Sequence, residues 1–204
     1  MKITIIGTGN VGAALAKGWA KAGHEILLGV RDSANFKGKE LLSQSNITII
    51  TIAEAVKNAE VVVVAIPPDA VNELVKSFGD VLGKVIIDAT NSVRSAPAGY
   101  ANVAEALRAL TNCVDVVKCF NSTGFENMGN PVYGGMGIDM FVAGESIKGK
   151  ETAKRLAKDL GFAECYDFGG NDKIALLEQF ALAWINLAVM QKQGRGIAFK
   201  LLKR

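Results

Sequence analysis

The residues whose spacing best indicates chemistry are three glycines in the segment Gly7-Thr8-Gly9-Asn10-Val11-Gly12. The G-x-G-x-x-G pattern here follows a short apolar run of strand type and opens a stretch of helical period. In that context Gly7 permits a tight turn, Gly9 lets the backbone approach a pyrophosphate, and Gly12 lets the helix pack closely on the strand. Amides at the start of the helix then face the phosphates. The segment predicts a dinucleotide site, and the alternative is a glycine turn without a ligand.

A second group of candidates stands at the end of the next predicted strand, in Gly29-Val30-Arg31-Asp32. Enzymes that bind NAD place an acidic residue there to hold the ribose diol. In this chain Gly29 or Val30 occupies that position, and Arg31 follows with a guanidinium suited to a bidentate contact with a 2′-phosphate. Asp32 leaves two alternatives open, since it can pair with Arg31 or accept from a ribose hydroxyl. The pattern favours NADP(H) over NAD(H).

Two further loops follow predicted strands that end at the same sheet edge, where an open α/β sheet binds its ligand. In Ala65-Ile66-Pro67-Pro68 the consecutive prolines make a stiff exit that can lie along the cofactor. Pro68 can equally be only the first residue of the next helix. In the other loop, Thr90 and Asn91 can hydrogen-bond the ribose or the carboxamide of the cofactor.

The loop after the sixth predicted strand is the candidate for the side of the hydride acceptor, through Asn121, Ser122 and Thr123. The single histidine, His24, precedes the second predicted strand, so we expect it at the opposite end of the sheet. A histidine–carboxylate pair that reduces a carbonyl is therefore not expected. Lys118 is the nearest alternative acid, although a lysine at a strand end is more often structural or exposed. Transfer of hydride between stacked heteroaromatic rings needs no such acid, because solvent can supply the proton.

Charge and cysteine content exclude several other classes of site. The net charge of +3 arises from 23 basic and 20 acidic residues that are interspersed, which disfavours nucleic acid as a partner. The three cysteines, Cys113, Cys119 and Cys165, show neither C-x-x-C spacing nor companion histidines. We therefore expect no metal site and a reducing compartment.

The distribution of apolar residues along the chain indicates where in the cell the protein resides. No signal peptide is recognised, and we expect a cytoplasmic protein. The longest apolar stretch, Phe180 to Met190, has eleven residues, whereas a bilayer span needs roughly 20. We therefore expect a buried or interface helix and no membrane partner.

An α/β fold must position these candidates. With 204 residues, half of them hydrophobic, the chain is long enough for one large core. From Lys2 to about Cys119, β-branched runs alternate with stretches of helical period, which is typical of a parallel sheet. The predicted strands are Lys2 to Ile6, Glu25 to Leu28, Ile47 to Ile50, Val61 to Ile66, Val85 to Asp88 and Val114 to Lys118. The predicted helices are Val11 to Ala22, Lys39 to Ser43, Ala53 to Asn58, Asp69 to Phe78 and Val103 to Leu110.

The chain changes character after Cys119. The segment Asn121 to Gly137 is rich in Gly, Asn and Pro and is predicted to be a long loop. Beyond it we expect a strand, a helix, a second strand and a long apolar helix, at Asp139 to Ala143, Gly149 to Leu160, Ala163 to Asp167 and Asn171 to about Gln193. The predicted fold class is thus α/β, a Rossmann doubly wound parallel sheet with a small C-terminal α/β extension ending in a long helix. We expect residues 1–120 to form the dinucleotide-binding Rossmann domain and residues 121–204 to form the small C-terminal extension.

An apolar stripe marks the last predicted helix. Phe180, Trp184, Leu187 and Met190 recur at helical spacing. The stripe can line an acceptor pocket, or it can belong to the core or a dimer interface, and the second interpretation is favoured.

The motifs together resemble those of the NADP oxidoreductases, coenzyme F-420-dependent, and their bacterial relatives known only as predicted dinucleotide-binding enzymes. The resemblance continues through Val117-Lys118-Cys119-Phe120-Asn121-Ser122, Phe141-Val142-Ala143-Gly144 and Trp184-Ile185-Asn186-Leu187-Ala188, and covers essentially the whole length. The first half is also similar to pyrroline-5-carboxylate reductase, which needs a larger second domain.

The resemblance implies an NADP(H)-binding Rossmann domain in residues 1–120 and a small C-terminal part, residues 121–204, that completes the cleft and contributes to a dimer. It also implies hydride transfer between the nicotinamide and a deazaflavin ring. It places Thr8, Asn10 and Arg31 at the cofactor and Ile66 and Pro67 beside the nicotinamide. Val30 and Asn121 depart from the family pattern, which has a serine and a histidine there. The candidate cofactor-binding residues are Gly7, Thr8, Gly9, Asn10, Val11, Gly12, Val30, Arg31, Ala65, Ile66, Pro67 and Asn91.

Three functions follow from these observations. The leading one is an NADP(H)-dependent oxidoreductase that passes hydride to a flat acceptor, namely deazaflavin coenzyme F-420, a flavin or a quinone-like molecule. The second is a non-catalytic NADP(H)-binding sensor or regulatory module. The third is a small imine or carbonyl reductase, which predicts sensitivity to changes at Lys118 or Tyr133. A homodimer is expected in each case.

Overall fold

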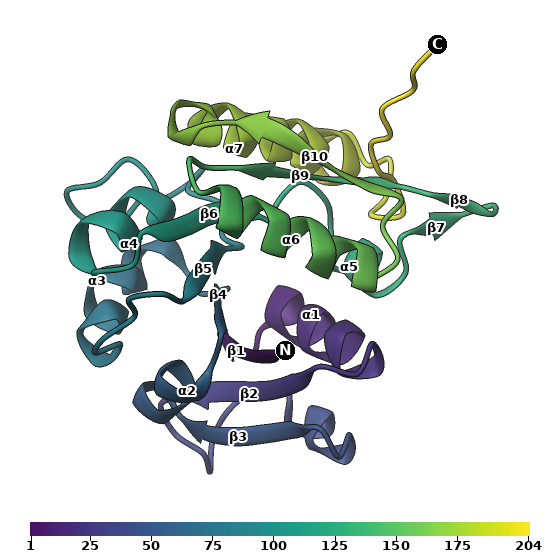
Figure 1. The fold of residues 1–204 in the computed structure, drawn as a ribbon. Coiled ribbons are helices and arrows are strands. Elements are labelled where there is room, and N and C mark those ends of the chain that lie inside the picture. The colour runs from purple at the N-terminus through teal and green to yellow at the C-terminus, as the bar shows by residue number, and fades with distance from the viewer.

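One eight-stranded sheet organises the chain in the computed structural model, which describes residues 1–204 (Figure 1). The strand order is β10-β9-β6-β5-β4-β1-β2-β3, and a separate hairpin pairs β7 with β8. The strands are β1 (Lys2–Ile6), β2 (Glu25–Val30), β3 (Ile47–Thr51), β4 (Val61–Val64), β5 (Val85–Asp88), β6 (Asp115–Cys119), β7 (Val132–Tyr133), β8 (Met136–Gly137), β9 (Asp139–Ala143) and β10 (Glu164–Gly169).

The first six strands confirm the predicted Rossmann fold. They run parallel to one another in the order 3-2-1-4-5-6, which puts the switch of direction between β1 and β4. The C-terminal extension joins the same sheet, because β9 pairs antiparallel with β6 and β10 pairs parallel with β9. The division at residue 120 stays a prediction.

Helices cover both faces of the sheet, as the doubly wound fold requires. They are α1 (Asn10–Lys21), α2 (Ile52–Asn58), α3 (Val71–Leu74), α4 (Val103–Leu110), α5 (Phe125–Gly129), α6 (Ile147–Asp159) and α7 (Ile174–Ile185). Helices α1 and α6 pack into one hydrophobic core, and α2, α3, α4 and α7 pack into the other. Figure 1 accordingly shows α6 and α7 on opposite sides of β9 and β10.

The central strand β4 explains why the sheet has two cores. Its four valines are all buried, and successive side chains of a strand point to opposite faces. Val61 and Val63 therefore join the core beneath α1, while Val62 and Val64 join the core beneath α4. A continuous run of β-branched residues suits a strand that is covered on both faces.

The prediction that residues 121–137 form one long loop is wrong in part. It contains the short helix α5 and the β7–β8 hairpin. Gly134 and Gly135 both have positive φ, at 57° and 84°, and form the two-residue connection of that hairpin. Two glycines with positive φ suit a type I′ turn, whose twist matches the flanking strands. The two glycines therefore mark a tight hairpin turn and do not indicate an irregular loop.

Three of the predicted helices are also less regular than expected. The region predicted as Asp69 to Phe78 is a short α-helix between two 3₁₀ segments, Pro68–Ala70 and Val75–Ser77. The last helix begins with a 3₁₀ turn and ends with a π-helical segment, Asn186–Met190, before the predicted end at Gln193. The segment Lys39–Ser43 is a 3₁₀ helix.

The C-terminal helix is longer than its apolar stretch suggested. From Asn171 to Met190 it has 20 residues and a mean hydropathy of 1.4, enough by length and composition alone to cross a membrane. Soluble core helices pass the same criterion, and this helix carries the buried carboxylate of Glu178. The predicted apolar stripe is divided, since Trp184 is buried and Leu187 and Met190 are exposed.

A buried ion network joins this helix to the sheet. The Lys118 Nζ atom on β6 lies 2.9 Å from Oδ2 of Asp88 on β5 and 2.5 Å from Oε1 of Glu178 on α7. The side chains of Lys118 and Asp88 are fully buried, and that of Glu178 is 7% exposed. Charges so far from water are retained only when they are paired, so each member depends on the others.

We predict that Lys118→Met destabilises the fold strongly, because it leaves two buried carboxylates without a cation. Loss of one partner from a buried pair costs about 3–5 kcal/mol. The free energy of unfolding is measured by urea denaturation. The matched control is Lys148→Met, whose half-exposed ammonium pairs with Asp115 at 3.1 Å and is worth less than about 1 kcal/mol. Equal losses in the two variants would contradict this account.

Candidate functional site

The glycine loop between β1 and α1 leaves no room for side chains at two of its positions. A Cβ atom on Gly12 would lie 1.8 Å from the carbonyl oxygen of Gly7. A Cβ atom on Gly7 would lie 2.2 Å from the carbonyl oxygen of Ala65, and the φ angle of Gly7 is 101°. Gly7 and Gly12 are therefore required by packing and backbone geometry within the protein.

Gly9 is different, because nothing in the protein explains it. No atom lies within 4 Å of the Cβ position on Gly9, and its φ of −72° is accessible to any residue. Gly9 is also the N-cap of α1, and no side chain caps the helix or places an acidic group in its first turn. The site thus offers free amides and open space above a glycine, which are the features that a pyrophosphate needs.

Gly12 and Gly9 allow a matched pair of substitutions, because packing requires the first glycine and not the second. Gly12→Ala is expected to lower the free energy of unfolding by about 1–3 kcal/mol or more, because the new methyl group meets backbone that cannot move aside. Gly9→Ala is expected to change it by less than about 1 kcal/mol, because the less flexible unfolded chain offsets the poorer N-cap. Thermal and urea unfolding of both variants check this. A large destabilisation by Gly9→Ala would mean that the protein itself requires the glycine.

Arg31 follows β2 at the carboxyl edge of the sheet. It is exposed and forms no ion pair in the structure. Asp32, which could have neutralised it, instead accepts hydrogen bonds on Oδ1 from the amides of Ala34 at 2.9 Å and Asn35 at 3.3 Å. The guanidinium is therefore available to an anion. Val30, just before it, is buried as the last residue of the strand.

The other residues predicted at the glycine loop lie where a ligand can reach them. Thr8 is partly buried, Asn10 is exposed, and Val11 is partly buried at the start of α1. A Cβ atom on Gly38, in the loop after β2, would lie 3.6 Å from Cβ of Thr8. That loop therefore borders the mouth of the glycine turn.

The exit of β4 lies beside the glycine turn. The Ala65 amide donates to the carbonyl of Ile6 at 2.8 Å, which continues the β1–β4 pairing by one residue. Ile66 follows in a bend, Pro67 precedes the next helix, and Pro68 is the first residue of a 3₁₀ helix. The helix-starting interpretation of Pro68 is therefore correct, while Ala65, Ile66 and Pro67 remain at the carboxyl edge.

Asp88 organises the end of β5. Its Oδ1 atom accepts from the amide of Thr90 at 2.9 Å and from the Thr90 hydroxyl at 2.7 Å, while its Oδ2 atom faces Lys118. Thr90 is thus bound within the protein rather than offered to a cofactor. Sequence reasoning missed this role for Asp88, although a buried aspartate two residues before a threonine is an Asx-type turn signal.

Asn91 and Asn121 are brought into direct contact by the adjacent strands β5 and β6. Asn121 Nδ2 donates to Oδ1 of Asn91 at 2.9 Å, and Asn91 Nδ2 donates to the main-chain oxygen of Asn121 at 3.1 Å. Ser122 is buried, with its hydroxyl 3.5 Å from the Met140 sulfur, and Thr123 Oγ1 accepts from Nδ2 of Asn127. Of the three residues predicted on the acceptor side, only Asn121 reaches the neighbouring loop.

The residues that could act as general acids are engaged elsewhere. Lys118 lies within the buried network, and the Tyr133 hydroxyl donates to Oδ1 of Asn127 at 2.6 Å. His24 is buried at the amino end of β2, as expected, with Nε2 2.9 Å from Asp159. The Cys119 thiol on β6 has a pKa well above its usual value, first because of burial and then because Cys165 is near. No group of three or more His, Cys, Asp or Glu side chains is placed to hold a metal.

The C-terminal tail packs against α5 and α7 through Arg195. Arg195 lies over the rings of Phe125 and Trp184, at 5.2 and 5.4 Å, and its guanidinium bonds both carboxylate oxygens of Glu126. Burial alone would raise the pKa of Glu126, but the hydrogen bond from Arg195 brings it below its usual value. Sequence reasoning missed this contact between residues 69 positions apart.

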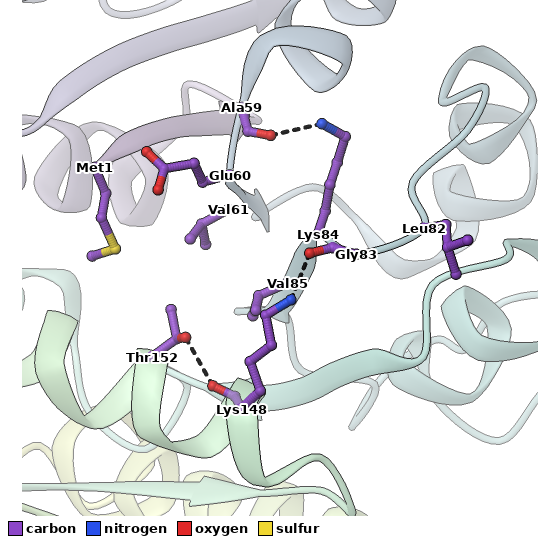
Figure 2. Close-up of a pocket in the computed structure, with 10 residues that line it drawn as sticks. All are labelled: Met1, Ala59, Glu60, Val61, Leu82, Gly83, Lys84, Val85, Lys148 and Thr152. Atoms are coloured by element: carbon purple, nitrogen blue, oxygen red, sulfur yellow. Dashed lines mark hydrogen bonds between the residues drawn. The ribbon is translucent and has the colours of Figure 1, made fainter.

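A hollow of about 410 Å³ lies at the opposite, amino edge of the sheet (Figure 2). Its charged groups are satisfied by the protein. Lys84 donates to the carbonyl oxygen of Ala59 at 2.7 Å, Lys148 donates to that of Gly83 at 2.5 Å, and Glu60 accepts from the Lys2 amide. The hollow therefore offers few free polar groups, and the functional candidates all lie at the other edge.

Comparison with known proteins agrees with this geometry. Residues 2–92 match the family described as NADP oxidoreductase coenzyme F420-dependent. The chain is 28% identical over 212 residues to the F420-dependent NADP reductase of Methanothermobacter marburgensis, and the match covers 94% of each chain. A solved structure from Arthrobacter sp. FB24, described provisionally as an F420-dependent NADP reductase, superposes with a TM-score of 0.86 at 24% identity over all of both chains.

A more distant likeness is to a reductive aminase from Aspergillus terreus, with a TM-score of 0.69 at 21% identity. It covers 94% of this chain but 62% of the aminase, so it reflects the shared fold alone. The family match includes β1, the glycine turn, Arg31 and the exits of β4 and β5, and the full-length similarity extends it to the C-terminal helix. The chain is similar to the coenzyme F420-dependent NADP oxidoreductase family over residues 2–92, and to the F420-dependent NADP reductase of Methanothermobacter marburgensis over 94% of its length.

Proposed function

We propose that this protein is an oxidoreductase that transfers hydride between NADP(H) and a flat heteroaromatic acceptor of the deazaflavin or flavin class. The observation that carries the proposal is the uncapped start of α1 above Gly9, next to an unpaired Arg31. Together they form an anion site with one part for a pyrophosphate and one for a 2′-phosphate. The similarity of the chain to the coenzyme F420-dependent NADP oxidoreductase family supports both partners.

The residues of this chain can hold NADP(H) along the carboxyl edge of the sheet. The first amides of α1 receive the pyrophosphate, and Arg31 receives the 2′-phosphate. Ile66 and Pro67 border the path toward the nicotinamide, and the Asn91–Asn121 pair lies at its far end. When bound, the nicotinamide supplies the hydride, while the protein orients it and excludes water.

The absence of a free acid favours ring-to-ring transfer. Lys118 is held by two carboxylates and Tyr133 by Asn127, so neither is available to protonate a carbonyl or imine. An acceptor ring that takes hydride and then a proton from solvent needs no such residue. This favours the flat acceptor over the imine or carbonyl reductase, while the non-catalytic sensor becomes an outcome of the kinetic test.

We also propose that the active protein is a cytoplasmic homodimer. The support is the exposed apolar surface at the end of the C-terminal helix, where Leu187, Val189 and Met190 are 40–52% exposed. Contiguous apolar residues on one helix are a common dimer contact. Size-exclusion chromatography with light scattering measures the mass, and a monomer at all concentrations would overturn this part.

The hydride-transfer reaction is tested by anaerobic stopped-flow absorbance at 340 nm, with NADPH mixed against deazaflavin, FMN and a quinone in turn. We expect fast oxidation with one of these acceptors and slow oxidation of NADH. Arg31→Ala should lower kcat/KM for NADPH about 10- to 100-fold and leave NADH almost unchanged, because a charge-assisted contact is worth about 1.5–3 kcal/mol.

The control is Arg155→Ala, which removes an exposed arginine from α6. It should leave the preference for NADPH intact. Tight NADPH binding without oxidation by any acceptor would favour the sensor. Equal losses for NADPH and NADH in Arg31→Ala would show that Arg31 does not read the 2′-phosphate.

A further inference from the structure

Two buried polar atoms at the carboxyl edge of β5 and β6 have no hydrogen-bond partner within the protein. They are the Oδ1 atom of Asn121 and the Oγ atom of Ser92, on neighbouring loops. The two other atoms of this kind belong to Asn72 and Arg108, on α3 and α4. Leaving such an atom unsatisfied costs about 1–3 kcal/mol, so native proteins keep few of them. Two at the predicted site indicate a partner that arrives with the ligand.

The direction of the Asn121 oxygen is set by Asn91. The donated bond from Asn121 Nδ2 to Asn91 Oδ1 and the return bond from Asn91 Nδ2 to the Asn121 main chain hold the amide group at two points. The Asn121 residue is only 4% exposed, whereas Asn91 is partly exposed. With its nitrogen already engaged, Asn121 presents an oxygen that can only accept a hydrogen bond.

The backbone just before Asn121 is strained. Phe120 has a φ of 63°, in the left-handed region that bulky residues rarely adopt, and it is 1% exposed. Its ring packs edge-on against Trp19 with the centroids 5.2 Å apart. Strain of this kind costs about 1–3 kcal/mol and persists where the surroundings enforce it, commonly at functional sites. The turn at Phe120 is what delivers Asn121 to Asn91 at the end of β6.

We propose that Asn121 and Ser92 form a polar subsite for a planar amide group of the bound ligand. An N–H of that group donates to Asn121 Oδ1, and the Ser92 hydroxyl donates to its carbonyl oxygen. Because Asn121 Oδ1 is buried, the loops after β5 and β6 must part as the ligand enters. The proposal deepens the proposed function and rests on it, since it requires a nicotinamide or an acceptor ring at this edge.

The matching group exists on both partners of the proposed reaction. The nicotinamide carries a primary carboxamide, and a flavin or deazaflavin ring carries an imide with an N–H between two carbonyls. Both offer a donor beside an acceptor, so the experiment needs one arm for each source.

The first arm measures binding of NADP⁺ and its 3-acetylpyridine analogue by isothermal titration calorimetry. The analogue replaces the carboxamide NH₂ by a methyl group and keeps the carbonyl. If the carboxamide is the source, the unchanged protein should bind the analogue about tenfold more weakly, and Asn121→Leu should bind both alike. Ser92→Ala, on an accessible loop, should weaken both ligands by the same factor.

The second arm compares KM for deazaflavin and its N3-methyl derivative. If the ring imide is the source, methylation should raise KM about tenfold in the unchanged protein and leave it unaltered in Asn121→Leu. Asn58→Leu is the matched control, because Asn58 is exposed at the end of α2 and bonds only Glu54. It should behave as the unchanged protein in both arms.

Thermal unfolding separates a structural role from the proposed one. Asn121→Leu removes a buried unsatisfied oxygen but also the hydrogen bond to Asn91, so its melting temperature should change little while its discrimination is lost. If Asn121→Leu does not fold, Ser92→Ala tests the subsite, because it should still weaken the binding of both ligands. Equal affinity and KM for each ligand pair in the unchanged protein would overturn the subsite alone, whereas no binding of NADP⁺ at all would overturn the proposed function.

Discussion

The buried network of Lys118, Asp88 and Glu178 is the constraint on which the rest of the architecture depends. A cation without access to water must be matched by carboxylates at hydrogen-bond distance, and here they come from two other elements. Glu178 joins α7 to the sheet across 60 residues of chain, and Asp88 uses its second oxygen to hold the turn at Thr90. The same charge pairing therefore places the C-terminal helix and shapes the end of β5.

Glycines allow the backbone to pack closely at the switch point of the sheet. Gly7 and Gly12 let β1, α1 and the exit of β4 approach within distances that a methyl group would forbid. Gly9 has no such neighbour, and the helix start above it has no cap from the protein. Packing explains two of the three glycines, and a bound anion is the simplest reason for the third.

The polar groups at the carboxyl edge of the sheet fall into two sets. One set is bonded within the protein, and the other has hydrogen-bonding capacity left for a ligand. Asp88, Thr90, Lys118, Tyr133 and Asn127 all have partners within the protein, whereas Arg31, Asn121 and Ser92 retain unused bonding capacity. This division agrees with the proposed transfer of hydride between two flat rings, which needs no proton donor from the protein. The single histidine, His24, takes no part at this edge, because it lies at the opposite end of the sheet and contacts Asp159.

The sequence by itself determined the parallel Rossmann sheet, the glycine turn and the position of Arg31. These depend on local properties, namely runs of β-branched residues, glycine spacing and the short path from a strand to the residue that follows it. Local signals could not show that β9 pairs antiparallel with β6, that Asp32 turns away from Arg31, or that residues 134 and 135 close a hairpin. Only the tertiary structure decided which buried polar groups found partners. Lys118 meets Glu178, and Asn121 meets Asn91, through contacts between distant segments. Whether a side chain is structural or free for a ligand depends on such contacts, because burial makes an unpaired polar group costly and a paired one stable.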